Sequence, residues 1–86
     1  MEIRYLSSFK RMYRKLPEIL QTQVDATLSL FEVDPFDLRL YNHKLSGSKR
    51  GIRSISAGYD LRILYVEENG HRIILLLAVG KHDDVY

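Results

Sequence analysis

The longest apolar run of this chain, Ile73–Val79, places the strongest constraint on its fold. At seven residues it is far too short for a membrane-spanning helix, which needs about 20 apolar residues, so no membrane association is expected. Apolar and polar residues do not alternate within the run, which is typical of a strand covered on both faces. The rest of the chain must therefore fold into layers around this strand.

The N-terminal part shows the apolar spacing of two amphipathic helices. A first stripe lies within residues 9–16 and a second within residues 19–31. Pro17 separates them, because proline is tolerated only in the first turn of a helix, and Asp34–Pro35 ends the second. The Ser7–Ser8 pair offers an N-cap for the first helix. The two segments predict a helical hairpin whose apolar stripes belong to the core.

Other segments predict strands. Residues 2–5 alternate and are expected at an edge of the sheet, residues 51–58 are short and mixed, and residues 59–66 alternate well. Asn69–Gly70 predicts a hairpin turn before the apolar run. This order predicts one domain, residues 1–86, of the α+β class, with an N-terminal strand and helical hairpin packed on a small antiparallel β-sheet. Two helices cover one face of such a sheet and leave the other partly open.

Composition excludes several kinds of chemistry. The chain has no cysteine, so disulfides, thiolate metal sites and thiol catalysis are excluded. It lacks a cluster with metal-ligand spacing, a Walker motif and a nucleophile-elbow serine, so no metal or other cofactor is expected. The first residues lack the apolar core of a signal peptide, and a cytoplasmic location is expected.

The charges are segregated along the chain, although the net charge is only +2. Residues 1–16 carry five basic residues and one acidic residue, and residues 18–37 carry five acidic residues and no basic one. Residues 39–62 carry six basic residues against Asp60 alone. Such blocks indicate a basic face for a polyanion and a separate acidic zone. A surface that is unevenly charged but only solvated is the alternative.

The residues that could carry chemistry follow the buried strand or lie on its neighbour. His82 and Tyr86 come directly after the apolar run, which would hold them at a fixed edge of the core. Arg62 is expected to point into the open face of the sheet, unless it pairs with Asp60. His43, ahead of a serine–glycine loop, is a further candidate.

His71 falls in the hairpin turn and is expected to be solvated. Lys49, Arg50 and Arg53 follow the serine–glycine loop, which predicts a phosphate-binding segment.

Side chains of these types can cleave RNA without a metal ion. The ribose 2′-hydroxyl is an internal nucleophile beside its own phosphodiester. A base must take its proton, cations must stabilise the transition state, and an acid must protonate the leaving 5′-oxygen. An aromatic ring can stack on a splayed base. The sequence contains these groups, although their presence alone does not define a site.

Three segments, "HKLSGSKRGIRSI", "YDLRILY" and "VGKHDDVY", resemble the RelE/ParE superfamily of type II toxins. The resemblance covers the order of all the elements and is most specific in residues 43–86. It implies catalytic roles for five residues: Arg62, His82, Tyr86, His43 and Asp60. Basic residues around them are expected to bind RNA phosphates: Lys44, Lys49, Arg50, Arg53 and Lys81. Ser56 and Ala78 depart from the YafQ-like pattern, which has basic residues at those two positions.

The resemblance implies a toxin that cleaves mRNA in the ribosomal A site and is neutralised by a cognate antitoxin in a toxin–antitoxin hetero-oligomer. ParE-like members of the superfamily instead inhibit DNA gyrase, and a toxin homologue with a weakened site would only bind its antitoxin. His82 and Tyr86 favour the endoribonuclease, because a gyrase inhibitor needs no proton-transfer residue. The two other readings stay open at the level of sequence.

Overall fold

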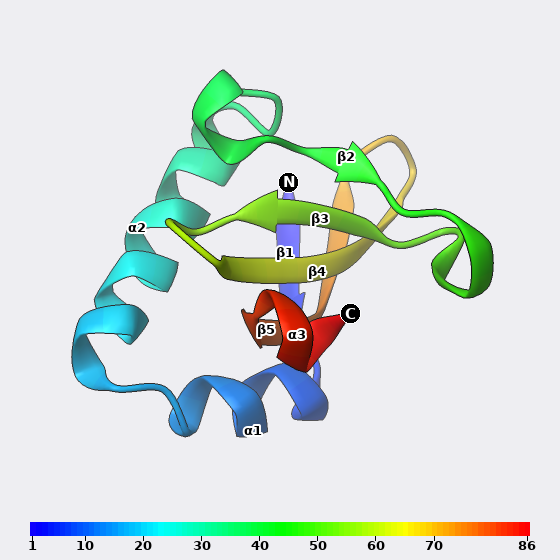
Figure 1. Ribbon diagram of the computed structural model, residues 1–86. Coiled ribbons are helices and arrows are strands. Elements are labelled where there is room, and N and C mark those ends of the chain that lie inside the picture. Colours follow the sequence, from blue (N-terminus) through cyan, green and yellow to red (C-terminus); the bar gives the residue numbers. More distant parts are fainter.

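Five strands form one mixed β-sheet in the computed structural model, which describes all residues 1–86 (Figure 1). The strands are β1 (Glu2–Tyr5), β2 (His43–Lys44), β3 (Arg53–Ser56), β4 (Leu61–Glu68) and β5 (Ile73–Lys81). Their order across the sheet is β1-β5-β4-β3-β2. β1 lies at an edge, as predicted, and runs parallel to β5, whereas the other neighbours are antiparallel. The two-residue strand β2 has no counterpart among the predicted strands.

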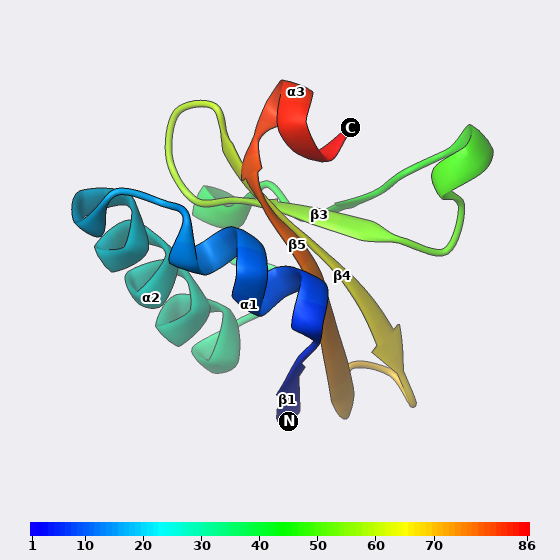
Figure 2. The same cartoon turned by 90° about the horizontal axis from the view of Figure 1, so that it is seen from below.

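Two helices, α1 (Ser7–Arg14) and α2 (Glu18–Val33), cover one face of this sheet (Figure 2). Pro17 separates them and α2 ends immediately before Asp34, as the sequence predicts. The predicted α+β class, with an N-terminal strand and a helical hairpin on a small β-sheet, is confirmed. None of the helices has both the length and the apolar composition needed to cross a lipid bilayer.

Three shorter helical segments complete the fold. They are the 3₁₀ turns η1 (Leu38–Leu40) and η2 (Gly47–Lys49) and the C-terminal helix α3 (His82–Val85). α3 follows β5 directly and lies at its C-terminal end, on the other side of the strands from α1 and α2 (Figure 2).

The start of α1 differs from the prediction. Its N-cap is Leu6, with no side-chain cap, so the proposed serine cap is wrong. Ser8 instead donates a hydrogen bond to the main-chain carbonyl of Leu77. The pairing of β4 with β5 shifts register there, because Tyr65 pairs with Leu76 and Leu64 with Ala78. The serine therefore binds the carbonyl of a bulged residue, whose backbone leaves the regular ladder.

One apolar core lies between the two helices and the sheet. β4 contributes Leu61, Ile63 and Tyr65, because every second residue of a strand faces the same side. Phe31 of α2 meets Tyr65 edge-on, with 5.0 Å between ring centroids. The predicted alternation is confirmed within β4, whereas Tyr59, predicted to face the same side, lies ahead of the strand and is fully exposed.

The apolar run forms an interior strand, since β5 lies between β1 and β4. Its residues toward the helices, Ile74, Leu76 and Val79, are buried. Leu75 and Ala78 are only half-buried. The sequence predicts that both faces of this strand are covered. The structure covers the helix side fully and the other side only in part, because only the short α3 lies over it.

Replacing Phe31 by alanine tests this core. Phe31 is fully buried, and Phe31→Ala is expected to lower the free energy of unfolding by about 3–5 kcal/mol, because it leaves a cavity against Tyr65. Val33→Ala, on the exposed side of the same helix, is the control and should change it by less than about 0.5 kcal/mol. Urea unfolding followed by circular dichroism measures both. Equal midpoints for the two variants would contradict the assigned core.

Candidate functional site

The face of the sheet opposite α1 and α2, here called the open face, brings together side chains from separate strands. Directly opposite residues of paired strands share a face, so His43 lies beside Ser54, and Ser56 lies beside Arg62. Ile55, between the two serines, belongs to the core, so both serines point away from the helices. The predicted orientation of Arg62 toward the open side follows from this register.

Arg62 is held by the turn between β3 and β4. Its Nη1 donates hydrogen bonds to Oγ of Ser56 at 3.3 Å and to the carbonyls of Gly58 and Leu61 at 3.2 and 3.0 Å. The alternative ion pair with Asp60 is not formed. Nε and Nη2 donate no hydrogen bond within the chain, so this edge of the guanidinium is free for an oxyanion, which the fork geometry of arginine fits with two parallel bonds. Ser56, where the YafQ-like pattern has a histidine, thus supports the arginine.

The C-terminal residues are tied to this face by two contacts. Tyr86 donates its hydroxyl hydrogen to Oγ of Ser54, a side chain with no exposed surface. The backbone N–H of His82 donates to the carbonyl of Asp60 at 2.9 Å. The imidazole of His82 meets the ring of Tyr86 edge-on, with 4.3 Å between centroids. His82 and Tyr86 are therefore placed against β3 and the turn that carries Arg62.

The backbone holds His43 in one tautomer. Its Nδ1 lies 2.8 Å from the carbonyl oxygen of Tyr41, and since a carbonyl only accepts, Nδ1 carries the hydrogen. The neutral imidazole then has its lone pair on Nε2. Tyr41 has a left-handed backbone, with φ of 51°, and its exposed ring meets the imidazole at 5.7 Å between centroids. His43 is thus arranged to accept a proton at Nε2.

Asp60 contributes its backbone to this region. It has a φ of 64° in the turn ahead of β4, and its carbonyl accepts the bond from His82. Its carboxylate has no hydrogen-bond or ion-pair partner in the chain.

Three of the predicted phosphate-binding residues, Lys44, Arg50 and Arg53, line one pocket together with Glu67, whereas Lys49 and Lys81 do not line it. Arg53 pairs with Tyr65 and lies on the helix side, with its guanidinium 5.4 Å from the ring centroid of Phe36. Lys44 lies opposite Arg53 across the ladder. Lys49 and Arg50 lie on the segment between β2 and β3, which extends away from the sheet (Figure 2). A fifth residue, Lys81, is exposed at the end of β5.

Sequence reasoning missed two residues of this face. Ser54 could have been placed by its alternation with Ile55, but no local signal pairs it with Tyr86, 32 residues further on. Tyr41 was missed because the η1 turn and β2 are too short to produce a periodic pattern.

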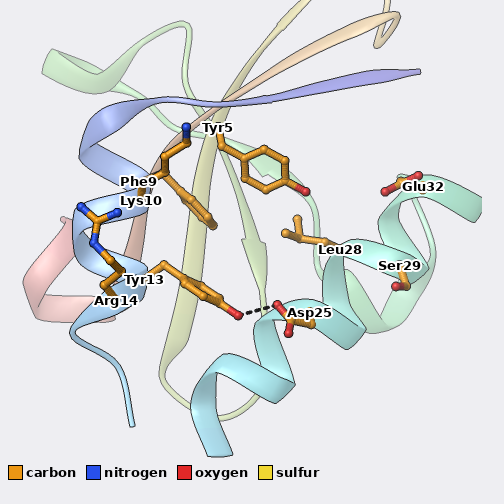
Figure 3. A pocket seen from close by; sticks show the side chains of 9 residues that line it. All are labelled: Tyr5, Phe9, Lys10, Tyr13, Arg14, Asp25, Leu28, Ser29 and Glu32. Carbon is orange, nitrogen blue, oxygen red and sulfur yellow. Dashed lines mark hydrogen bonds between the residues drawn. The ribbon is translucent and has the colours of Figure 1, made fainter. Parts of the chain in front are cut away.

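A groove of about 490 Å³ lies on the helix side of the molecule, between α1 and α2 (Figure 3). Aromatic side chains from β1 and α1 line it: Tyr5, Phe9 and Tyr13. Lys10 and Arg14 lie along α1, and Asp25 and Glu32 lie along α2. The hydroxyl of Tyr13 donates to Asp25 at 2.8 Å, and this bond raises the pKa of the tyrosine. The mixed charge does not suit a polyanion, and the groove contains none of the predicted site residues.

The structure contains no group of three or more histidine, cysteine or acidic side chains placed to hold a metal ion. The side chains gathered on the open face carry imidazole, guanidinium and phenol groups.

Replacing Tyr86 by phenylalanine tests how the tail is held. Tyr86→Phe leaves the buried Oγ of Ser54 without its partner, which costs about 1–3 kcal/mol, and should free α3. Amide hydrogen exchange at His82 and Tyr86 is expected to accelerate. Tyr59→Phe is the control, because Tyr59 is fully exposed. Unchanged exchange in Tyr86→Phe would show that the bond does not hold the tail.

Comparison with known proteins gives matches in structure alone. No family model and no curated protein matches the sequence. The YafQ structure from E. coli superposes with a TM-score of 0.78 at 15% identity, over 99% of this chain and 97% of that chain. A YoeB/ParE toxin from Agrobacterium tumefaciens gives 0.77 at 14% identity, over 95% and 99%. The toxin–antitoxin complex RelBE2 from Mycobacterium tuberculosis gives 0.66 at 23% identity, over 94% and 96%.

These matches span nearly the whole of each chain, so they include the N-terminal strand, the helical hairpin and the C-terminal strands. The resemblance of residues 43–86 is therefore confirmed for the fold: this chain has the fold of the RelE/ParE superfamily of toxins.

Proposed function

We propose that the chain is the toxin of a type II toxin–antitoxin system and acts as a metal-independent, ribosome-dependent mRNA endoribonuclease. The observation that carries this proposal is the arrangement of the open face. It combines an imidazole with a free Nε2 on His43, a guanidinium with a free edge on Arg62, and the His82–Tyr86 pair. The solved toxins with the same fold support the toxin class.

The proposed reaction uses the RNA's own 2′-hydroxyl as the nucleophile. Nε2 of His43 takes its proton, and the oxygen attacks the adjacent phosphorus. The bond from phosphorus to the 5′-oxygen breaks, and His82 donates a proton to that oxygen. The products are a 2′,3′-cyclic phosphate and a 5′-hydroxyl end, so no external nucleophile is consumed. Proton transfer by placed side chains of this kind contributes about 10²–10⁴-fold to a rate.

Arg62 has the electrostatic role in this proposal. The free Nε and Nη2 donors would contact the oxygens that gain charge in the transition state. Because Ser56, Gly58 and Leu61 already hold Nη1, the guanidinium does not need to reorganise during the reaction. Tyr86 has its hydroxyl bound to Ser54, so its ring is left for stacking on a base. Asp60, assigned a catalytic role by the resemblance, would act through its backbone contact to His82.

The proposed partner is a cognate antitoxin in a toxin–antitoxin hetero-oligomer. RelBE2, one of the solved structures with this fold, is such a complex. An acidic antitoxin segment would suit Lys49 and Arg50 on the projecting segment between β2 and β3. Lys44, Arg53 and Lys81 are proposed to contribute to RNA or antitoxin binding through long-range charge. The proposed location of both partners is the cytoplasm.

Primer extension tests the nuclease directly. A defined mRNA is incubated with the purified protein, with and without translating ribosomes, beside His43→Ala and His82→Ala. Discrete cuts that require ribosomes are expected, and each variant should slow cutting by about 10²–10⁴-fold because it loses a proton-transfer group. Both variants should stay folded, since both imidazoles lie outside the core.

Two outcomes of that experiment would reject the proposal. Cutting at an undiminished rate by both histidine variants would reject the assigned mechanism. Growth arrest by a wild-type protein that makes no cuts would reject the nuclease and favour the gyrase inhibitor, which a DNA supercoiling assay would then identify.

The role of Arg62 has its own test. Arg62→Ala should reduce the rate constant for cleavage by about 10²–10³-fold, the cost of losing one donor to a developing oxyanion. Arg72→Ala, at an exposed arginine in the β4–β5 turn, is the matched control and should cleave at the wild-type rate. Single-turnover cleavage with saturating ribosomes measures both. Equal rates for the two variants would remove Arg62 from the mechanism.

A further inference from the structure

A chain of polar side-chain contacts on the helix side connects Asn42, Tyr65, His71 and Glu67; we call these four residues the polar relay. Nδ2 of Asn42 donates to the hydroxyl of Tyr65 at 2.8 Å, and that hydroxyl lies 2.9 Å from Nε2 of His71. Nδ1 of His71 lies 2.6 Å from Oε2 of Glu67. The side chain of His71 is only 13% exposed, so the expectation that it is solvated is wrong.

The hydrogen bonds of Tyr65 set the tautomer of His71. The hydroxyl oxygen of Tyr65 accepts from Asn42, so its own hydrogen is left for Nε2 of neutral His71, which accepts it. Nδ1 of His71 then carries the ring hydrogen and faces Oε2 of Glu67, a buried atom that makes no hydrogen bond of regular geometry in the chain. The donors point one way, from Asn42 through Tyr65 to His71.

Aromatic rings enclose the middle of the relay. Tyr65 has no exposed surface, and His71 packs against Phe36 and Phe31 with 5.2 and 6.3 Å between ring centroids. Burial raises the pKa of Tyr65, which keeps its hydroxyl protonated and able to donate. In such surroundings a donor or acceptor without a partner costs about 1–3 kcal/mol, so breaking one bond of the relay disturbs its neighbours.

Asn42 is the point at which the relay meets the open face. It immediately precedes His43, the first residue of β2, and its side chain meets Tyr65 on the helix side, whereas His43 lies opposite Ser54 on the open face. Its Nδ2 also donates to the carbonyl of Pro35 at 2.8 Å, and its Oδ1 accepts from Nε of Arg53 at 3.0 Å. Asn42 is thus held from three directions, by Tyr65, Pro35 and Arg53.

Strand β2 has little other support. It is two residues long and pairs only with β3, at the edge of the sheet. Tyr41, which sets the tautomer of His43, has the uncommon left-handed backbone of a non-glycine residue. Such a conformation persists only where the surroundings hold it. The side-chain bonds of the neighbouring Asn42 can provide that hold.

We propose that the polar relay positions His43: Tyr65 and His71, on the far side of the sheet, fix Asn42 and thereby the place and orientation of the imidazole on the open face. Tyr65, His71 and Asn42 are thus positioning residues that touch no substrate. The inference rests on the proposed function only for the catalytic consequence. The structural consequence, a displaced His43 when the relay is broken, is independent of it.

A pair of tyrosine variants tests the relay. Tyr65→Phe removes one hydroxyl from its middle, and Tyr13→Phe, which removes the hydroxyl bound to Asp25 in the helical groove, is the matched control. The chain has three histidines, so the ring signals of His43 can be assigned by NMR with one variant per histidine. Tyr65→Phe is expected to shift the His43 ring signals and Tyr13→Phe to leave them unchanged.

The cleavage kinetics give a second readout. Tyr65→Phe should lower kcat on the order of 10-fold or more with KM unchanged, because a displaced base acts on a substrate that still binds. Tyr13→Phe should change neither constant. Both variants are assayed without urea, and their urea unfolding curves are measured separately. These curves show whether each variant is fully folded under the assay conditions, so that a loss of folded protein is not read as a loss of kcat.

A second pair of variants distinguishes the loss of the relay from a general loss of stability. The side-chain oxygen of glutamine can take the place of Nε2 in histidine as the acceptor for Tyr65, whereas leucine has no acceptor. His71→Gln should therefore retain most of the wild-type kcat and His43 signals, and His71→Leu should lose both. Equal effects of these two variants would mean that His71 contributes packing alone and would overturn the relay.

The outcomes separate this inference from the proposed function. Unshifted His43 signals and an unchanged kcat in Tyr65→Phe would overturn the relay while leaving the nuclease in place. Absence of cleavage by the wild type, together with shifted His43 signals in Tyr65→Phe, would reject the nuclease and uphold the positioning of His43.

Discussion

The alternation of side chains along β3 and β4 is the constraint on which the rest of this structure depends. Leu61, Ile63 and Tyr65 of β4 are packed beneath the helices, so Arg62 between them has to emerge on the opposite side. In β3, the burial of Ile55 likewise makes Ser54 and Ser56 point to the open face. A shift of one residue in β4 would exchange core and open face, which the cost of burying Arg62 forbids.

The same arrangement gives the end of the chain its attachment points on the open face, although α3 is only one turn long. The hydroxyl of Tyr86 binds Ser54 of β3 and the backbone of His82 binds Asp60 in the turn ahead of β4, so hydrogen bonds attach the end of the chain to one strand and to the turn that follows it. Helices as short as α3 are not stable alone, and its order derives from these tertiary contacts. Both imidazoles of the proposed site are thereby held by elements with little stability of their own: α3 for His82 and β2 for His43.

The two sides of the sheet have different chemical characters but share a backbone. The helix side combines apolar packing with one chain of polar contacts, from Asn42 to Glu67, whereas the open face presents unpaired polar edges to solvent. Asn42 and His43 are adjacent residues that belong to opposite sides. Under the proposed positioning of His43, a substitution at His71, which packs against Phe36 on the helix side, would displace a side chain on the open face.

Local patterns were sufficient to predict much of the fold. Helical spacing, with the breaks at Pro17 and Asp34–Pro35, predicted α1 and α2, since each pattern is long enough to show its period. Alternation predicted which side of β4 faces the core, and therefore where Arg62 points. The lack of alternation in Ile73–Val79 predicted an interior strand. The prediction that Ser7 or Ser8 caps α1 was wrong, because Ser8 donates its hydrogen bond to the carbonyl of the bulged residue Leu77, 69 residues away.

The candidate site was predictable in its residue types and only partly in its arrangement. His82, Tyr86, Arg62 and His43 could be selected from the sequence, and their catalytic roles stay predictions. The bond of Tyr86 to Ser54, the tautomer of His43 and the burial of His71 could not be anticipated, since each depends on a partner from another element.

The sequence by itself determined the secondary structure of the long elements and, in β4, the side of the sheet to which the residues point. These properties follow from backbone geometry and apolar periodicity, which operate over a few neighbouring residues. Tertiary structure alone decided which polar groups meet: Ser56 with Arg62, Ser54 with Tyr86, and Asn42 with Tyr65. A hydrogen bond requires its two atoms to lie within about 3 Å in a set direction, and only the packed sheet brings residues of different strands to that distance.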